Sequence, residues 1–241
     1  MKFDQVGVDS RPSHIRGRSE RGQLLMMMML TFVAGLVDAV GYLGLDHIFA
    51  GNMTGNIVIL GLGAAGADEL PVLGPLLALV SFVGGACVTG FWLRAGGGMW
   101  NRWVTVQLSV GVLLLGSTAA LLWIFDESTT GPEKVFAACA IAAQMGSQAC
   151  IARYLAVKEM TTVVVTSTLT ALAGESVHGK HGPRILNRRS GAIFMVFGGA
   201  VIGALLLRVH VSIPIALSAV MTGVVVLVGS RRWSRAPRQL G

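Results

Sequence analysis

Asp38 has the clearest chemical potential in this chain, because it is a carboxylate inside an apolar stretch that runs from Gln23 to Leu45. A charged side chain at the middle of a membrane-spanning helix costs about 2.5–3.5 kcal/mol on insertion scales, so it should face a cavity and have a partner. Such a carboxylate could couple the movement of a cation or proton, or contact a polar solute directly. The alternative is a structural carboxylate bound to a neighbouring backbone or hydroxyl group.

A polar break follows Asp38 and reads Gly-Asn-Met-Thr-Gly-Asn over residues 51–56, after which the chain is apolar through residue 67. Asn52, Thr54 and Asn56 could cap the start of a short helix, and Gly55, like the glycine at 51, permits a bend. Free N–H groups at such a start would suit an anionic or polar ligand group. Alternatively, the two glycines, four residues apart, could serve a close helix crossing.

A second polar break occupies the matching place in the other half of the chain, where residues 160–168 read Met-Thr-Thr-Val-Val-Val-Thr-Ser-Thr. Irregular backbone survives at membrane depth only where protein or a water-filled cavity satisfies it, and paired breaks point to the substrate site of a transporter built from two repeats. Gln148 precedes the second break, and its amide could line a cavity or join two helices. The candidate site therefore comprises Asp38, Asn52, Thr54, Gly55, Asn56, Gln148, Thr162 and Thr166.

The elements that must position these residues are membrane-spanning helices. The chain has 241 residues, of which 53% are hydrophobic and only 13% charged, which is not a soluble composition. Its apolar runs are each near the roughly 20 residues that cross a bilayer. The expected spans are Gln23–Leu45, Pro71–Leu93, Trp103–Phe125, Val135–Leu155, Ser190–Leu207 and Val211–Gly229. We therefore expect an all-α polytopic membrane bundle of six transmembrane helices.

The distribution of charge favours six crossings over eight. If each broken segment crossed the membrane, the basic residues near Arg94 and Arg153 would lie outside, against the positive-inside rule. If both broken segments instead enter and leave on one side, only Lys134 and Arg208 of the 19 basic residues lie outside. Each half then contains three crossings and one short broken or re-entrant helix. An odd number of crossings per half gives two inverted repeats, with both termini cytoplasmic.

One membrane domain over residues 23–230 is expected, with repeat halves of about 23–125 and 133–230. Polar tails flank it over residues 1–22, expected to be disordered, and 231–241; their basic residues would contact anionic lipid headgroups rather than nucleic acid. Enzyme motifs such as GxSxG and HExxH are absent, and no residues stand at metal-ligand spacing, so we expect neither catalysis nor a cofactor. Glycine-rich helix faces would permit a homodimer without requiring one.

The chain resembles the YoaK-like family of uncharacterised bacterial multi-pass membrane proteins. The resemblance covers about residues 24–230 and rests on Leu-Val-Asp-Ala-Val at 36–40, Asn-Met-Thr-Gly-Asn at 52–56, Gly-Ser-Gln-Ala at 146–149, and threonines at 161, 162 and 166. The chain departs from the family where Gln148-Ala149 replaces Gln-Asn and Thr166-Ser167 replaces Thr-Gly. The resemblance implies an integral membrane location and about six spans, and it supplies no substrate.

Two functions of different classes fit these observations. The first is a transporter or channel in the cell membrane that passes a small polar solute or ion through a cavity between the two repeats. The second is a non-transporting interaction or assembly protein, in which the polar breaks serve helix packing only. A wet interior around Thr54 would favour the first function, and a dry one the second.

Overall fold

The computed structural model describes residues 13–67, 70–94, 99–125, 131–155 and 188–234, and the described residues form seven helices. Six are long and one, α2, is short. Their bounds are α1 Ser13–Gly44, α2 Met53–Ala64, α3 Leu73–Leu93, α4 Arg102–Ile124, α5 Gly131–Tyr154, α7 Arg188–Leu207 and α8 Ser212–Ser234.

Six of these helices are long and apolar enough to cross a membrane, which confirms the expected all-helical class and the six long spans. The candidate spans begin and end within four residues of the predicted ones, and α2 is the shorter apolar helix among the described residues. The expected N-terminal tail differs, because α1 is helical from Ser13, well before the apolar span begins at Gly22. Good helix formers such as Arg and Glu continue the hydrogen-bond ladder of the span toward its N-terminus.

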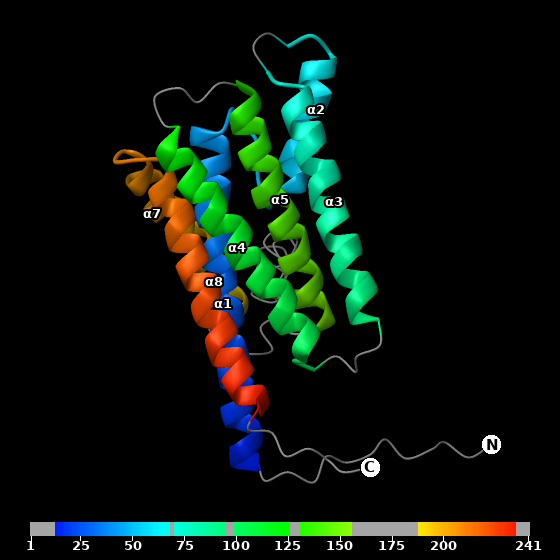
Figure 1. Cartoon of the computed structure of the whole chain (residues 1–241), viewed down its shortest axis with the longest axis vertical. Helices are drawn as coiled ribbons and strands as arrows, with labels where there is room; N and C mark the ends of the chain where they lie inside the picture. Colours follow the sequence, from blue (N-terminus) through cyan, green and yellow to red (C-terminus); the bar gives the residue numbers. More distant parts are fainter. Residues whose placement is uncertain (1–12, 68–69, 95–98, 126–130, 156–187, 235–241) are drawn as a thin grey trace, which may run out of the picture.

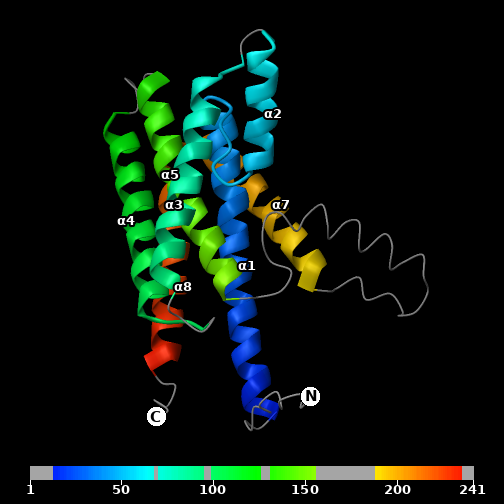
Figure 2. The same cartoon turned by 90° about the vertical axis from the view of Figure 1, so that its right-hand side faces the viewer.

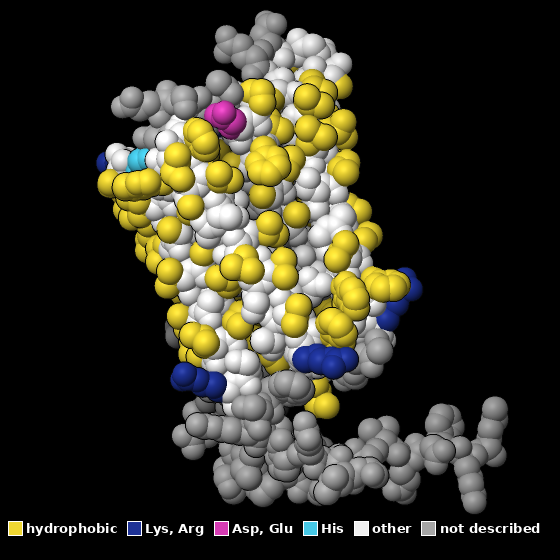
Figure 3. Space-filling model, viewed as in Figure 1, with side chains coloured by type: hydrophobic (Ala, Val, Ile, Leu, Met, Phe, Trp, Pro, Cys, Tyr) yellow, Lys and Arg dark blue, Asp and Glu magenta, His cyan; other side chains and the backbone are white. Residues whose placement is uncertain are grey.

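The long helices run up and down through a single bundle (Figure 1). The start of α1 and the end of α8 lie together at the lower end of this view. On the face in Figure 3, most Lys and Arg side chains gather near the lower end, whereas Asp and Glu lie at the upper end. Charge is therefore segregated along the long axis of the bundle, as in a protein oriented by the positive-inside rule.

Three helix pairs make the closest packing of the bundle, namely α1 with α7, α3 with α5, and α4 with α8. Glycine allows the first two pairs to approach backbone to backbone. A Cβ added to Gly35 in α1 or to Gly199 in α7 would overlap a carbonyl oxygen of the other helix. Gly85 in α3 and Gly146 in α5 stand in the same relation to each other's helices. These small residues are the reason that the helices lie in direct backbone contact.

The chain reverses between α1 and α2 and runs back along α1, as Figure 2 shows. Asp46 and His47 adopt left-handed backbone conformations with φ of 62° and 59°, which turns the chain after α1 ends. The Ile48 carbonyl then packs against Gly41, where a Cβ would overlap it. From this point α2 rises again to the same end of the bundle at which α1 ends and α3 begins.

Candidate functional site

The carboxylate of Asp38 binds the backbone of the polar break. Its Oδ1 atom accepts hydrogen bonds from the N–H groups of Gly51, at 2.6 Å, and Asn52, at 3.2 Å. Asp38 lies six residues before the end of α1, about 9 Å along a helix that rises 1.5 Å per residue. The bonds therefore hold the break at this depth in the bundle, where unpaired N–H groups would be costly.

The start of α2 is closed by the protein's own groups. Asn52 is its N-cap and accepts a hydrogen bond from the Gly55 N–H at 3.2 Å, while the Asp38 carboxylate stands just before it. Both groups satisfy donors that a ligand would otherwise use, and the carboxylate complements the positive end of the helix dipole. The expectation of an anion at this helix start therefore loses its physical basis.

Asn56 holds the loop before α2 rather than facing a ligand. Its Oδ1 accepts from the Phe49 N–H at 2.8 Å, its Nδ2 donates to the Phe49 carbonyl at 2.7 Å, and the residue is 1% exposed. Gly55 packs against the Phe49 ring, and a Cβ built on Gly55 would stand 2.6 Å from a ring carbon of Phe49. Thr54 is exposed on the outside of α2. In this conformation Asn56 therefore stabilises the loop before α2, Thr54 lies outside the cavity wall, and Gly55 packs against Phe49.

Between the two apolar cores of the bundle lies a polar layer. One core surrounds α1 from Val33 to Leu45, and the other surrounds Met26 to Leu30. The polar layer consists of buried or partly buried side chains that lie along their helices between members of the two cores, namely Thr31 of α1, Thr89 of α3, Gln148 of α5 and Thr222 of α8.

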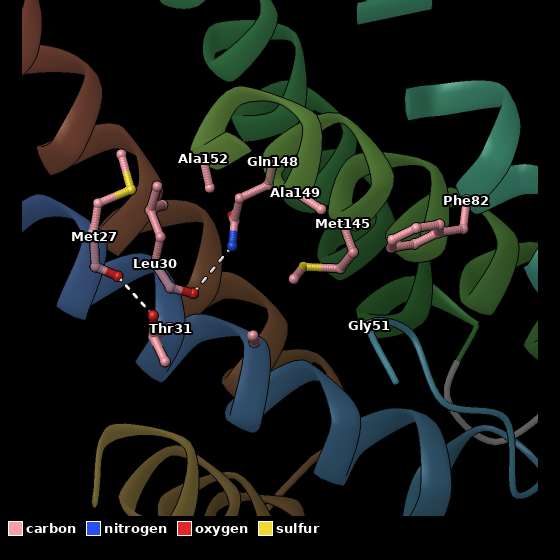
Figure 4. Close-up of a pocket in the computed structure, with 10 residues that line it drawn as sticks. Met27, Leu30, Thr31, Gly51, Phe82, Met145, Gln148, Ala149 and Ala152 are labelled. Carbon is pink, nitrogen blue, oxygen red and sulfur yellow. Dashed lines mark hydrogen bonds between the residues drawn. The ribbon is translucent and has the colours of Figure 1, made fainter. Parts of the chain in front are cut away.

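A small cavity of about 30 Å³ opens in this layer between α1 and α5. Figure 4 shows Gln148 and Thr31 on one part of its wall and the backbone of Gly51 on another. The other wall residues are Met27, Leu30, Ala34, Phe82, Met145, Ala149 and Ala152. A cavity that holds a water needs about 10–15 Å³, so this one accommodates about two water-sized groups.

The Asp38 carboxylate lies just behind the Gly51 end of the cavity. A Cβ built on Gly51 would stand 3.5 and 3.6 Å from the two carboxylate oxygens, and 3.5 Å from the methyl group of Met145. All three distances are ordinary van der Waals contacts. Gly51, a residue of the cavity wall, is therefore in direct contact with the Asp38 carboxylate.

Three buried polar atoms have no hydrogen-bond partner among the described residues, and two of them belong to the polar layer. The three atoms are Thr89 Oγ1, Gln144 Nε2 and Gln148 Oε1. The Gln148 amide donates through Nε2 to the Leu30 carbonyl at 3.0 Å, which turns its oxygen toward other partners. The Gln144 amide instead lies against Gly111 of α4, away from the cavity wall. An unpaired buried polar atom costs about 1–3 kcal/mol, so Thr89 Oγ1 and Gln148 Oε1 make the polar layer suited to a polar partner.

Of the predicted site, the structure thus places Gln148 in the cavity wall and Asp38 against the wall residue Gly51, and it leaves Thr54 and Asn56 elsewhere. Thr162 and Thr166 lie outside the described residues. Thr31 and Met145 were missed from the sequence. Thr31 precedes Asp38 by seven residues, or two helical turns, so helical spacing could have placed both on one face of α1. Met145 carries no polar signal, and only the packing identifies it.

Comparison with known proteins agrees with the membrane architecture. Residues 26–228 match a family model described as "Protein of unknown function (DUF1275)". The chain is also 33% identical over 161 residues to the UPF0700 transmembrane protein YoaK of Bacillus subtilis (strain 168). That alignment covers 66% of this chain and 68% of the relative. No solved structure gives a significant match.

Proposed function

The chain belongs to the DUF1275 family of multi-pass membrane proteins of unknown function, and we propose that it passes a small polar solute or ion between two inverted repeats. The path is centred on the cavity between α1 and α5. The observation that carries the proposal is this cavity in a polar layer, with apolar cores on either side and a half-buried carboxylate next to its wall residue Gly51.

The packing of the helices supports the two inverted repeats. In this scheme α1, α3 and α4 of the first half correspond to α5, α7 and α8 of the second. The pair α1 with α7 then corresponds to α5 with α3, and α1 with α8 corresponds to α5 with α4. Both members of each correspondence pack closely, and α4 with α8 is its own counterpart. The polar break before α2 has its counterpart in residues 160–174, outside the described part of the chain.

The glycine contacts support the same correspondence residue by residue. Gly35 contacts the carbonyl of Val196, and Gly146 contacts the carbonyl of Phe82. Gly146 follows Gly35 by 111 residues, and Val196 follows Phe82 by 114 residues. Gly199 meets the carbonyl of Phe32, and Gly85 meets that of Ala143 with the same two offsets. Adjacent Gly-Gly pairs at 84–85 and 198–199 are also 114 residues apart. These equal offsets support two halves that share one fold.

The offset of 111 residues supports a position of the cavity at the axis between the two proposed halves. It pairs Ala34 of α1 with Met145 of α5, and both line the cavity. It also pairs Asp38 with Ala149, another wall residue, so only one half supplies a carboxylate. Because substrate sites of inverted-repeat transporters lie near the midplane between repeats, this position supports a transport path.

In the proposed orientation in the cell membrane, the basic end of the bundle is cytoplasmic and α2 re-enters from outside. A cysteine at Ala67, just after α2, tests this in a chain whose three native cysteines are replaced. A membrane-impermeant thiol reagent is expected to label it in intact cells. The control cysteine at Arg94, on the basic end, is expected to react only after permeabilisation. Protection at Ala67 together with labelling at Arg94 in intact cells would instead mean that α2 crosses fully.

Transport itself is tested by the swelling of proteoliposomes in urea, glycerol, and the chlorides of ammonium, sodium and potassium. At least one probe is expected to enter faster than in protein-free liposomes. Gly51→Ala should slow that probe about tenfold, because its methyl group occupies the carboxylate end of the cavity and one factor of ten corresponds to about 1.4 kcal/mol. The matched control is Gly61→Ala in α2, where an added Cβ meets nothing within 4 Å.

The two possible contradictions have different meanings. If no probe enters faster than in protein-free liposomes, passage of small solutes is wrong, and the interaction or assembly role becomes the better account. If a probe enters but Gly51→Ala and Gly61→Ala behave alike, the path does not use the cavity. Both variants should fold, since neither added methyl group meets an atom closer than 3.5 Å.

A further inference from the structure

The polar side chains of the cavity wall, Gln148 and Thr31, use their hydrogen-bond donors within the protein and leave acceptor oxygens available. Gln148 is 5% exposed, and its Oε1 is unpaired while its Nε2 is bound to the Leu30 carbonyl. Thr31 Oγ1 donates to the Met27 carbonyl at 2.9 Å, so its proton is used and its lone pairs remain. Figure 4 shows both side chains on the cavity wall, with their hydrogen bonds to the Leu30 and Met27 carbonyls as dashed lines. A ligand here must supply positive charge or a hydrogen-bond donor.

The negative charge beside the cavity has no basic partner among the described residues. The interactions that Asp38 makes are with backbone N–H groups. Hydrogen bonds from backbone satisfy a carboxylate in part, but an ionised group inside a membrane is ordinarily paired with an opposite charge. A cation in the adjacent cavity would supply that charge without any change of the protein's own side chains.

Size and charge restrict the cation further. The cavity of about 30 Å³ holds about two water-sized groups, which excludes a large organic cation. Divalent calcium is usually held by six to eight oxygen atoms with several carboxylates, whereas this site offers one carboxylate and neutral oxygens. Among the described residues, no three His, Cys, Asp or Glu side chains come together as a metal site. The single negative charge of the Asp38 carboxylate is balanced by a cation of charge +1.

We propose that this cavity binds a small monovalent cation between Gln148 Oε1 and the Gly51 end of the wall, where the Asp38 carboxylate balances its charge. The inference rests on the proposed function, in that the bound cation is the solute itself or its coupling ion. It names the substrate class that the geometry favours and replaces the anion expected from the helix start.

The test is the thermal unfolding of the purified full-length protein in detergent, titrated with sodium, potassium or ammonium chloride. N-methyl-D-glucamine chloride keeps the ionic strength constant and is too large for the cavity. At least one of the three small cations is expected to raise the midpoint saturably. At ten times the dissociation constant the rise should be about 3–6 °C, as expected for a ligand that binds only the folded state.

Two buried glutamines on α5 provide a matched pair of variants. Gln148→Met removes the oxygen at the cavity, and Gln144→Met removes an equally buried amide that lies against Gly111 and outside the wall. We expect Gln148→Met to raise the cation concentration at half-effect about tenfold or more, because a hydrogen-bonding partner of a charge contributes about 1.5–3 kcal/mol. Gln144→Met should leave it within about twofold.

Asp38→Asn keeps the test decisive if Gln148→Met fails to fold. Both backbone donors bind the same oxygen, Oδ1, so the asparagine carbonyl can accept both bonds while the charge is lost. This variant should fold and lose the response to the cation. A response unchanged in Asp38→Asn would overturn the proposal, as would equal responses in the two glutamine variants. Stabilisation by lower pH with no dependence on any of the three salts would assign the positive charge to a proton and also overturn it.

The outcomes separate this inference from the proposed function. Saturable stabilisation by a cation without faster entry of any probe into proteoliposomes would retain the cation site and remove transport. Entry of urea or glycerol through the Gly51-dependent path, with no cation response, would retain transport and remove the cation site.

Discussion

Gly85→Ala and Gly199→Ala are each expected to destabilise the protein by about 3 kcal/mol, the upper part of the range for overpacking a tightly packed interior. The reason is a backbone contact that no side-chain rearrangement can relieve. A Cβ at Gly85 would overlap the carbonyl of Ala143, and a Cβ at Gly199 would overlap the carbonyl of Phe32. Thermal unfolding in detergent should show midpoints lower by roughly 6–12 °C.

The neighbouring glycines are the controls for this prediction. Gly84 has nothing within 4 Å of an added Cβ, and the atom nearest to a Cβ added at Gly198 is a ring carbon of Phe32 at 3.8 Å. Alanine at either position should be neutral or stabilise by up to about 1 kcal/mol, since alanine favours a helix more than glycine does. If each Gly-Gly pair gave equal effects at its two positions, the helices would not pack through these backbones. Similar losses in Gly85→Ala and Gly199→Ala would support the repeat.

Asp38→Ala is expected to produce the second large loss of stability, of about 1–3 kcal/mol for each of the two backbone N–H groups that it leaves unpaired. These donors belong to Gly51 and Asn52 and stand at membrane depth, where water cannot replace the lost acceptor. Asp38→Asn should retain most of the stability because its Oδ1 can still accept both bonds. Equal losses in the two variants would mean that charge, and not the hydrogen bonds, holds the break.

Chemical denaturation of both variants measures this difference, and proteolysis within 45–52 measures where the loss occurs. The segment from Leu45 to Asn52 should be cleaved faster in Asp38→Ala than in Asp38→Asn, because the polar break loses its attachment to α1. Asn56 still holds the Phe49 backbone through two hydrogen bonds, so the start of α2 should remain helical in both variants.

The spans could be predicted from the sequence because each apolar run has the length that a bilayer requires, and no tertiary contact competes with that constraint. Asp38 could be singled out for the same reason, since a carboxylate in such a run needs a partner. Its partners are backbone N–H groups thirteen and fourteen residues later, and no sequence pattern distinguishes them from a side-chain partner or a ligand.

The roles of Asn56 and Thr54 could not be predicted, because an amide or hydroxyl near a helix start serves equally well for a loop, a cap or a ligand. The direction of the chain after α1 decides among these roles, and it depends on the turn at Asp46 and His47. The Gly-Gly pairs at 84–85 and 198–199 were visible in the sequence. Small residues of this kind allow close helix packing, but the partner helices come from elsewhere in the chain and follow only from the fold.

The packing of α1 against α7 has a consequence for biosynthesis. The glycine face of α1 enters the membrane first, yet the helix that covers it begins at Arg188, so most of the chain must be made before α1 gains its main partner. During this interval α1 is held mainly by its own insertion and by the early contact with Gly51 and Asn52. A chain that stops before α7 would leave its first helix incompletely packed, and quality control of this protein would therefore recognise a missing C-terminus at the N-terminal helix.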